Sequence, residues 1–269
     1  MFLRITAGSQ EKNAKNTMKL FEALDIDLTR NELICFVGAG GKTTSLFRLA
    51  RELKGCNKSV LVTTTTAIYY PDDGDCDEVI AGIPQIKTRS KKTSGACIVA
   101  MGSEITPENK LLGVDRFSVA GFHQEKLFDY ILVEADGSRQ RPLKAPADHE
   151  PVIPQGTTKT VGVIGLDALG KEITGTTVHR PELLCRLTAK VMGAVIDEEV
   201  IARLIRAPQG LFKSVPEGSQ RYVVFNKVEN SDRQQSARCI IESVKGHFSG
   251  IQGFIVANML EGNITRVRQ

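Results

Sequence analysis

One stretch organises this chain, Ile34-Cys-Phe-Val-Gly-Ala-Gly-Gly-Lys-Thr-Thr44. Its first four residues are apolar and predict a short buried strand, and three glycines follow within four positions. The next residues, Thr44-Ser-Leu-Phe-Arg-Leu-Ala-Arg-Glu-Leu53, have the apolar spacing of an amphipathic helix. Glycines let backbone N–H groups approach an anion, and a helix N-terminus adds free N–H groups and a favourable dipole. This order of strand, glycine turn, lysine and hydroxyls predicts a loop that holds nucleotide phosphates.

The residues of this loop predicted to bind the nucleotide are Gly38, Ala39, Gly40, Gly41, Lys42, Thr43 and Thr44. Lys42 would reach the outer phosphates and support catalysis, and the Thr43 hydroxyl would ligate Mg²⁺. The usual G-x-x-x-x-G-K-[ST] spacing needs a glycine where this chain has Phe36, so the turn is shorter. The G-x-x-G-K-T-T form resembles the ATP loop of the Mur ligase and folylpolyglutamate synthetase families. A glycine-rich turn that binds nothing is the alternative, and the combined pattern argues against it.

A second strand supplies acidic residues that are expected to face the loop. Tyr130 to Val133 is an apolar strand closed by Glu134, with Asp136 two residues further on. An acid at the end of a hydrophobic strand suits a Walker-B-type site, in which Glu134 would hold Mg²⁺ beside the phosphates. Asp136 would orient an attacking water or a substrate hydroxyl. Solvated acids at an ordinary strand end are the alternative.

Three cations follow on the next segment, at Arg139, Arg141 and Lys144. They are expected to stabilise phosphate charge in a transition state or to bind an anionic second substrate, with Arg139 and Lys144 as catalytic residues. Solvent-facing charges are the alternative for each. The adjacent residues Asp148-His-Glu150 are predicted to form a structural loop, because three consecutive side chains do not converge on one metal ion.

A candidate site for the nucleotide base lies near the C-terminus. Gln220-Arg-Tyr-Val-Val-Phe-Asn-Lys-Val-Glu229 is an apolar strand that runs into Asn226, Lys227 and Glu229. GTP-binding proteins use Asn-Lys-x-Asp at such a place, where the carboxylate accepts hydrogen bonds from guanine. Glu229 is one methylene longer than aspartate, so the choice between ATP and GTP stays open. A plain strand end with polar residues is the alternative.

Two further places are candidates for anion or metal contacts. Pro181 begins a predicted helix to Met192, so His179 and Arg180 stand at its N-terminus, where an anion can bind or simple capping suffices. The predicted strand Ser59–Thr66 ends in four threonines. Thr65 would touch Mg²⁺ if the carboxyl end of that strand faces the ligand, although threonine also suits strands by its β-branching.

The order of predicted elements favours one α/β domain over residues 1–269, of three layers and P-loop NTPase-like, with a mostly parallel central sheet. A small helical subdomain at about 178–215 is expected. The strongest additional helix is 197–206, with Asp197 as N-cap. Further helices are predicted at 16–24, 116–127 and 231–244, strands at 79–81, 96–101, 159–165 and 253–257, and an irregular excursion over 71–95.

Bulk properties restrict the class of protein and its partners. The chain has 269 residues, 41% hydrophobic and 25% charged, and its net charge of +4 argues against nucleic acid as a partner. Its one basic run, Lys87-Thr-Arg-Ser-Lys-Lys92, is short and is predicted to be a solvated loop. No apolar run or signal sequence points to a membrane, so a cytoplasmic location is expected. Six scattered cysteines without C-x-x-C indicate reduced, structural thiols.

Taken together, six motifs of this chain resemble those of the YqeC family, and the resemblance extends from about residue 16 onward. The motifs lie at residues 37–44, 62–66, 133–138, 142–146, 178–182 and 226–229. The resemblance implies a P-loop NTPase-like fold. It also implies an accessory role for a selenium-dependent molybdenum hydroxylase, with that hydroxylase or its cofactor precursor as partner. Lys144, His179 and Arg180 gain support because they lie within these motifs, and Arg139 because it directly follows the 133–138 motif.

The leading hypothesis is a Mg²⁺-dependent protein that binds ATP or GTP and acts as an NTPase or in phosphoryl or nucleotidyl transfer, during maturation of such a hydroxylase. One alternative is a non-catalytic binding module whose nucleotide state controls docking to a client. Another is a Mur-like ATP-dependent ligase, for which the sequence shows no acceptor domain.

Overall fold

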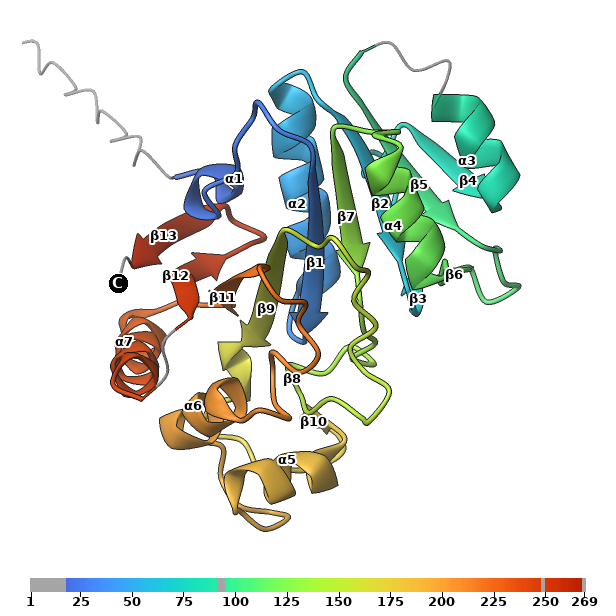
Figure 1. Ribbon diagram of the computed structural model, residues 1–269. Coiled ribbons are helices and arrows are strands. Elements are labelled where there is room, and N and C mark those ends of the chain that lie inside the picture. The colour runs from blue at the N-terminus through green and yellow to red at the C-terminus, as the bar shows by residue number, and fades with distance from the viewer. Residues whose placement is uncertain (1–17, 91–94, 248–249, 268–269) are drawn as a thin grey trace, which may run out of the picture.

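The computed structural model describes residues 18–90, 95–247 and 250–267 (Figure 1). The start of the helix predicted at 16–24 and the end of the basic run at 87–92 lie outside the described residues. A nine-stranded sheet forms the middle of the molecule, in the order β13-β12-β11-β9-β1-β7-β2-β5-β4. Its strands are β1 Glu32–Gly38, β2 Ser59–Thr64, β4 Glu78–Ala81, β5 Cys97–Gly102, β7 Tyr130–Glu134, β9 Lys159–Gly165, β11 Gln220–Asn226, β12 Ile251–Asn258 and β13 Asn263–Val267.

All neighbouring strands in this sheet are parallel, except that β13 runs antiparallel to β12. The expected mostly parallel sheet is therefore confirmed. Parallel strands place their carboxyl ends at one edge, and strand β1 lies between β9 and β7. The glycine turn after β1 consequently lies beside the acidic end of β7.

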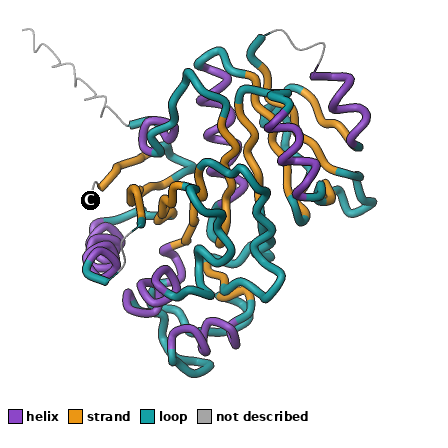
Figure 2. The backbone as a smooth tube through the Cα atoms, in the orientation of Figure 1, coloured by secondary structure: helices purple, strands orange, loops and turns teal. Residues whose placement is uncertain are grey.

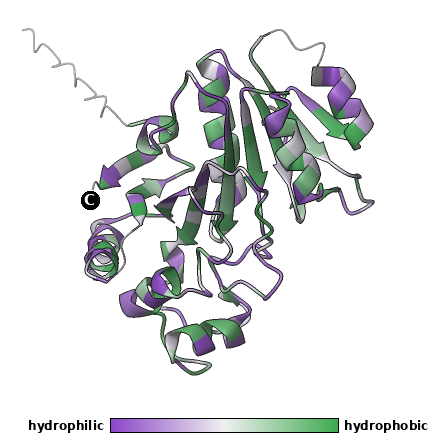
Figure 3. Ribbon diagram, viewed as in Figure 1, coloured by the Kyte–Doolittle hydropathy of each residue, from purple (hydrophilic) through white to green (hydrophobic). Residues whose placement is uncertain are grey.

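Helices cover both faces of the sheet, which makes three layers. On one face are α1 Leu20–Ala23 and α2 Lys42–Gly55, and on the other are α3 Ile83–Ser90, α4 Arg116–Gln124, α6 Glu198–Arg206 and α7 Ser231–Lys245. Both faces of the sheet are apolar because side chains alternate along each strand. In β1, Ile34 and Phe36 pack against α2, while Leu33 and Cys35 face the core on the opposite side. Strands are mostly hydrophobic along their length, and the helices are hydrophobic on one side (Figure 3).

Smaller elements lie near the carboxyl edge of the sheet. Strand β3 (Ala67–Tyr69) pairs antiparallel with β6 (Lys110–Leu112), and β8 (Leu143–Lys144) pairs parallel with β10 (Val178–His179). Long loops surround the β8–β10 ladder, and α5 (Pro181–Thr188) follows it (Figures 1 and 2). Helices α5 and α6 pack together, and their apolar residues join the same core as the sheet.

Several sequence predictions need correction at this level. The 71–95 segment is more regular than expected, because it contains the whole of α3 in addition to β4, the strand predicted at 79–81. Helix α5 ends at Thr188 and not at Met192, since Ala189 takes a left-handed φ of 53°. Strand β13 was not predicted. The N-cap at Asp197 is confirmed, because its carboxylate accepts a hydrogen bond from the Val200 N–H at 2.8 Å.

None of the helices in the described part of the chain has the length and apolar character needed to cross a membrane.

Candidate functional site

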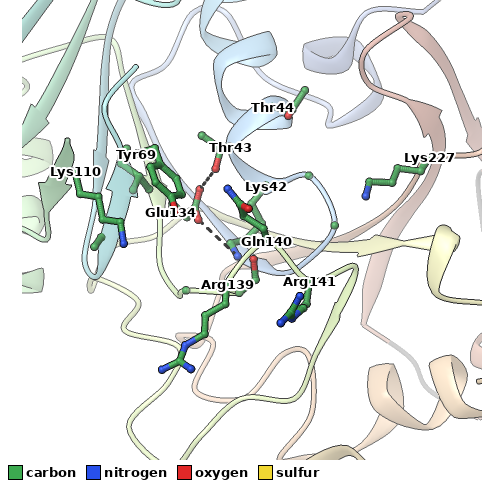
Figure 4. Close-up of a pocket in the computed structure, with 16 residues that line it drawn as sticks. Lys42, Thr43, Thr44, Tyr69, Lys110, Glu134, Arg139, Gln140, Arg141 and Lys227 are labelled. Atoms are coloured by element: carbon green, nitrogen blue, oxygen red, sulfur yellow. Dashed lines mark hydrogen bonds and ion pairs between the residues drawn. The ribbon is translucent and has the colours of Figure 1, made fainter. Parts of the chain in front are cut away.

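A cavity of about 610 Å³ opens at the carboxyl ends of β1 and β7 (Figure 4). Its walls come from the glycine turn and the start of α2, the end of β7, the loop after β7, the β3–β6 ladder and the residue after β11. The side chains that line it include Lys42, Thr43, Thr44, Tyr69, Lys110, Glu134, Arg139, Gln140, Arg141 and Lys227.

The glycine turn is packed so closely that side chains do not fit in it. Gly40 and Gly41 have φ values of 82° and 124°, which L side chains rarely adopt. A Cβ on Gly40 would lie 2.3 Å from the Gly165 nitrogen, and one on Gly41 would lie 2.1 Å from Asn226 Nδ2. The glycines are therefore required by the close approach of β9 and β11 as well as by any ligand.

The amides of the loop divide into two groups. The Gly38 N–H donates to Asp136 Oδ2 at 3.1 Å, and the Ala39 N–H donates to the Val163 carbonyl at 2.8 Å. These two residues anchor the turn. The amides from Gly40 to Thr44 have no hydrogen-bond partner among the described residues. Gly41 is the N-cap of α2 and Lys42 begins the helix, so the unpartnered amides face the cavity wall at a helix N-terminus, which is suited to an anion.

Lys42 is held in the loop by internal partners. It is 3% exposed, and its Nζ donates to the Gly38 carbonyl at 2.6 Å. Nζ also lies 3.1 Å from Asp136 Oδ1 and 3.6 Å from Glu134 Oε1. Burial lowers the pKa of Lys42, but the two carboxylates outweigh it and raise the pKa above its usual range. The side chain is thus a cation next to the unpartnered amides.

Thr43 and Glu134 meet at the wall of the cavity. The Thr43 hydroxyl donates to Glu134 Oε2 at 2.6 Å, and Figure 4 shows this contact beside Lys42. Burial raises the pKa of Glu134, against the opposing charge of Lys42. A hydroxyl and a carboxylate facing one cavity are the hard oxygen ligands that Mg²⁺ prefers, so these two residues fit that ion.

Thr65, the other predicted metal ligand, is not part of this wall. Its hydroxyl donates to the Val152 carbonyl at 2.8 Å, and Thr65 does not line the cavity. Thr64 likewise donates to the Glu134 carbonyl at 2.8 Å. The prediction for Thr65 was wrong because the hydroxyls at this strand end join backbone segments.

Asp136 does not face the cavity either. It is 2% exposed, and its oxygens contact the Gly38 N–H, Lys42 and Lys144. Because Asp136 is buried and does not line the cavity, it is not placed to orient a water or a substrate hydroxyl there. The predicted catalytic role of Asp136 is therefore corrected to that of a residue that positions the turn and Lys42.

Lys144 is likewise internal, although it was predicted to be catalytic. It is 2% exposed, and its Nζ donates to the Gly137 carbonyl at 2.7 Å. It also lies 2.9 Å from Asp136 Oδ2 and 2.9 Å from Glu150 Oε2. Glu150 pairs in turn with Arg180. Buried ion pairs thus run without a break from Lys42 through Asp136, Lys144 and Glu150 to Arg180.

The predicted anion site at His179 and Arg180 is filled from within the protein. Arg180 precedes α5 with a left-handed φ of 65°, and its guanidinium donates to Glu150. Burial, with the charges of Arg180 and Lys144, lowers the pKa of His179 to about 4, so this ring is neutral at pH 7. Neither residue lines the cavity. The anion at this place is the Glu150 carboxylate.

The predicted base site is only partly present. Asn226 is 4% exposed, and its Nδ2 donates to the Gly40 carbonyl at 2.8 Å while its Oδ1 accepts from the Met259 N–H at 3.0 Å. Lys227 lines the cavity and pairs with Asp167 at 3.0 Å. The Glu229 side chain is 59% exposed, pairs with Arg233 and does not line the cavity. Asn226 is therefore a structural link, and Lys227 alone faces the cavity.

The sequence profile of the family described as YqeC protein matches residues 34–182. The "Uncharacterized protein YqeC" of Escherichia coli strain K12 is 33% identical over 228 residues, which cover 84% of this chain and 88% of that protein. This chain belongs to the YqeC family. The resemblance drawn from its motifs is confirmed.

Two solved structures are similar to this YqeC-family chain. Chloroplast FtsY from Physcomitrella patens has a TM-score of 0.44 and 13% identity, covering 91% of this chain and 64% of its own. FtsY from Mycoplasma mycoides has a TM-score of 0.35 and 14% identity, covering 89% of this chain and 57% of its own. The chain thus spans less than two thirds of either structure. Its own strand–turn–helix and parallel sheet are those of P-loop nucleotide-binding proteins.

Sequence reasoning missed several residues of the cavity in this YqeC-family protein, among them an aromatic ring and a lysine. Tyr69 and Lys110 come together through the β3–β6 ladder, and neither belongs to a recognisable motif. Arg139 and Arg141 were predicted, and both line the cavity without an ion pair among the described residues. The only carboxylate in the described wall is Glu134. The cavity therefore attracts anions.

The ion pairs of Glu150 predict a pH-dependent contribution to stability. Burial raises the pKa of Glu150, but Lys144 and Arg180 outweigh it and lower the pKa to about 2. A lowered pKa in the folded state contributes stability above the unfolded value near 4.5, and this stability is lost as the pH falls towards 2. We expect Glu150→Gln to cost about 3 kcal/mol at pH 7, from the pKa difference.

Urea denaturation of the wild type and Glu150→Gln at pH 7, 4 and 3 measures this effect. The difference in the free energy of unfolding should shrink steadily as the pH falls. The matched control is Glu217→Gln on an exposed turn, which should show little difference at any of these pH values. A Glu150→Gln cost that stays constant down to pH 3 would contradict the assignment of these ion pairs.

Proposed function

We propose that this protein binds a nucleoside triphosphate together with Mg²⁺. The observation that carries the proposal is the run of unpartnered amides from Gly40 to Thr44 beside the buried cation of Lys42. Five amides and an ammonium facing a cationic cavity are suited to the negative charge of a polyphosphate. ATP and GTP both remain candidates, because Glu229 does not reach the cavity.

The contacts of the wall suggest how the triphosphate lies. Thr43 and Glu134 would hold Mg²⁺, which neutralises charge on the two outer phosphates when bound. The outer phosphates would therefore lie near the end of β7. Lys42 would exchange its contacts with the Gly38 carbonyl and Asp136 for phosphate oxygens, and Asp136 would keep Lys144 as a partner.

Turnover by hydrolysis, phosphoryl transfer or nucleotidyl transfer is the reaction class that we propose. Among the described residues that line the cavity, Glu134 is the one carboxylate, and as a ligand of Mg²⁺ it would keep the metal against the phosphates during the reaction. Arg139 and Arg141 would stabilise charge that develops on the phosphates. A non-catalytic, nucleotide-gated module would use the same binding residues without turnover.

The proposed client of the protein is inferred from the family resemblance. The YqeC motifs imply an accessory role in maturation of a selenium-dependent molybdenum hydroxylase, in the cytoplasm, and we keep that role as part of the proposal. Copurification of the hydroxylase with the wild type, weakened in a variant that cannot bind nucleotide, is the expected result.

Calorimetric titration with ATP and with GTP, with Mg²⁺ or with EDTA, tests the binding. We expect Lys42→Met to weaken binding by roughly 10- to 100-fold, the usual worth of hydrogen bonds to a charged group. Thr43→Val should remove the dependence on Mg²⁺ while the fold is kept. The control is Lys54→Met, which removes an exposed lysine at the far end of the same helix.

The outcomes separate the candidates. A wild type that binds neither triphosphate, or Lys42→Met and Thr43→Val proteins that bind like the wild type, would overturn the proposal. Phosphate release without a client, lost in Lys42→Met, would identify an NTPase. Tight binding with no release or transfer would identify the nucleotide-gated module instead.

A further inference from the structure

An exposed aromatic ring stands in the wall of the cavity, across from the phosphate loop. Tyr69 is 55% exposed, and Lys110 Nζ lies 5.1 Å from the centroid of its ring. Both residues line the same cavity as Lys42. Lys110 has no ion pair with a carboxylate among the described residues. Large aromatic side chains are usually buried, so an exposed ring in a cavity wall needs a reason.

The backbone ladder sets the positions from which the ring and the ammonium enter the cavity wall. Ala67, Ile68 and Tyr69 pair with Leu112, Leu111 and Lys110. The Val114 N–H donates to the Thr64 carbonyl at 2.8 Å, which ties this ladder to the end of β2. The two residues are therefore neighbours in the cavity wall before any ligand binds.

The direction of a bound triphosphate can be inferred from where the β3–β6 ladder lies relative to the proposed metal ligands, Thr43 and Glu134. In the sheet, β7 and β2 lie on one side of β1, while β9 and β11 lie on the other. Glu134 ends β7, Tyr69 follows β2, and Lys227 follows β11. Figure 4 likewise shows Tyr69 and Lys110 on one side of Lys42 and Lys227 on the opposite side.

This arrangement orients the triphosphate. Mg²⁺ bridges the outer two phosphates in nucleotide sites, so Thr43 and Glu134 mark the outer end of the chain of phosphates. The outer end therefore points towards Tyr69, and the nucleoside extends towards Lys227. The space between Glu134 and the β3–β6 ladder is left for a different molecule.

We propose that Tyr69, Lys110 and Arg139 form a subsite for a second ligand, a phosphorylated molecule that carries a planar ring. This inference rests on the proposed binding of a triphosphate. The ring of the ligand stacks on Tyr69, and its phosphate contacts Lys110 and Arg139. Nucleoside monophosphates are the simplest compounds of this class.

The competing interpretation is that Tyr69 stacks on the base of the triphosphate itself. The two interpretations differ in which ligand loses affinity when the ring is removed. In the proposed arrangement, Tyr69→Ala weakens the second ligand only. In the competing one, it weakens the triphosphate and leaves no second site.

The test is calorimetric titration in two stages. The first measures the Mg²⁺ complexes of β,γ-imido ATP and β,γ-imido GTP. The second adds AMP, GMP, adenosine or ribose 5-phosphate to protein saturated with the analogue that bound. We expect a monophosphate to bind, with ribose 5-phosphate and adenosine weaker because each lacks one of the two recognised groups.

Variants assign the contacts. Tyr69→Ala should weaken the monophosphate about tenfold, whereas Tyr69→Phe should retain it. Arg139→Gln should weaken the monophosphate and ribose 5-phosphate alike and leave adenosine unchanged. The matched control is Phe117→Ala, because Phe117 is also exposed, has Arg116 at 5.0 Å and lies outside the cavity.

Each failure has its own signature. If neither imido analogue binds in the first stage, the proposed function fails. If an analogue binds and neither monophosphate follows, the second-ligand subsite is overturned while the proposed function stands. A loss of analogue affinity in Tyr69→Ala would overturn the subsite in favour of base stacking.

Discussion

Replacing Lys144 by methionine is expected to lower the free energy of unfolding by about 3–5 kcal/mol, the usual cost of removing one partner from a buried ion pair. Lys144 is 2% exposed and lies between the carboxylates of Asp136 and Glu150. Methionine has a similar length, so the change removes the charge and its hydrogen bonds more than the packing. The carboxylate of Asp136 would then keep only Lys42 as a cationic partner, and that of Glu150 only Arg180.

Guanidinium or urea denaturation at pH 7 measures this loss. Lys171→Met serves as the control, since the Lys171 side chain is exposed and has no partner among the described residues. Its free energy of unfolding should stay within about 0.5 kcal/mol of the wild-type value. A Lys144→Met protein as stable as the wild type, but unable to turn over nucleotide, would restore the catalytic role that the sequence predicts.

The second large effect is expected at Asn226. Asn226→Ala leaves the Gly40 carbonyl and the Met259 N–H without their partner, and both contacts are buried. Each unsatisfied group costs about 1–3 kcal/mol, so a loss of about 2–5 kcal/mol in the free energy of unfolding is expected. Because Gly40 is released, affinity for ATP and GTP should fall together, and no selectivity should be lost.

Glu229→Gln is the matched experiment for base recognition. The Glu229 side chain pairs with Arg233 on the surface, so this variant should retain both stability and the ratio of ATP to GTP affinities. Thermal unfolding and competition titration measure the two variants side by side. A selective loss of GTP binding in either variant would contradict the structural role of Asn226 and reinstate a guanine site at 226–229.

The phosphate loop and its acidic neighbour were predictable because each depends on local pattern and on one rule of topology. Apolar runs, glycines and helical spacing set β1, the turn and α2. Parallel strands align their carboxyl ends, so an acid that closes β7 had to lie near the loop. The observed contact between Thr43 and Glu134 at 2.6 Å is the result.

The roles of the other charged residues were not predictable in the same way. A sequence shows that Asp136, Lys144 and Arg180 carry charges, but not whether each charge meets a partner or the solvent. Glu150 and Arg180 are 30 residues apart, and they meet because β8 pairs with β10. In the folded chain these side chains, which resemble catalytic groups in the sequence, are buried and paired with one another as ions.

The amino-acid sequence by itself determined the alternation of strands and helices, the position of the glycine turn and the family. These follow from side-chain periodicity and backbone freedom, which act over a few neighbouring residues. Only the tertiary structure decided which cations face the cavity. Arg139, Arg141 and Lys110 remain open to a ligand while Lys144 and Arg180 are neutralised inside, because that division depends on pairings between distant segments of the chain.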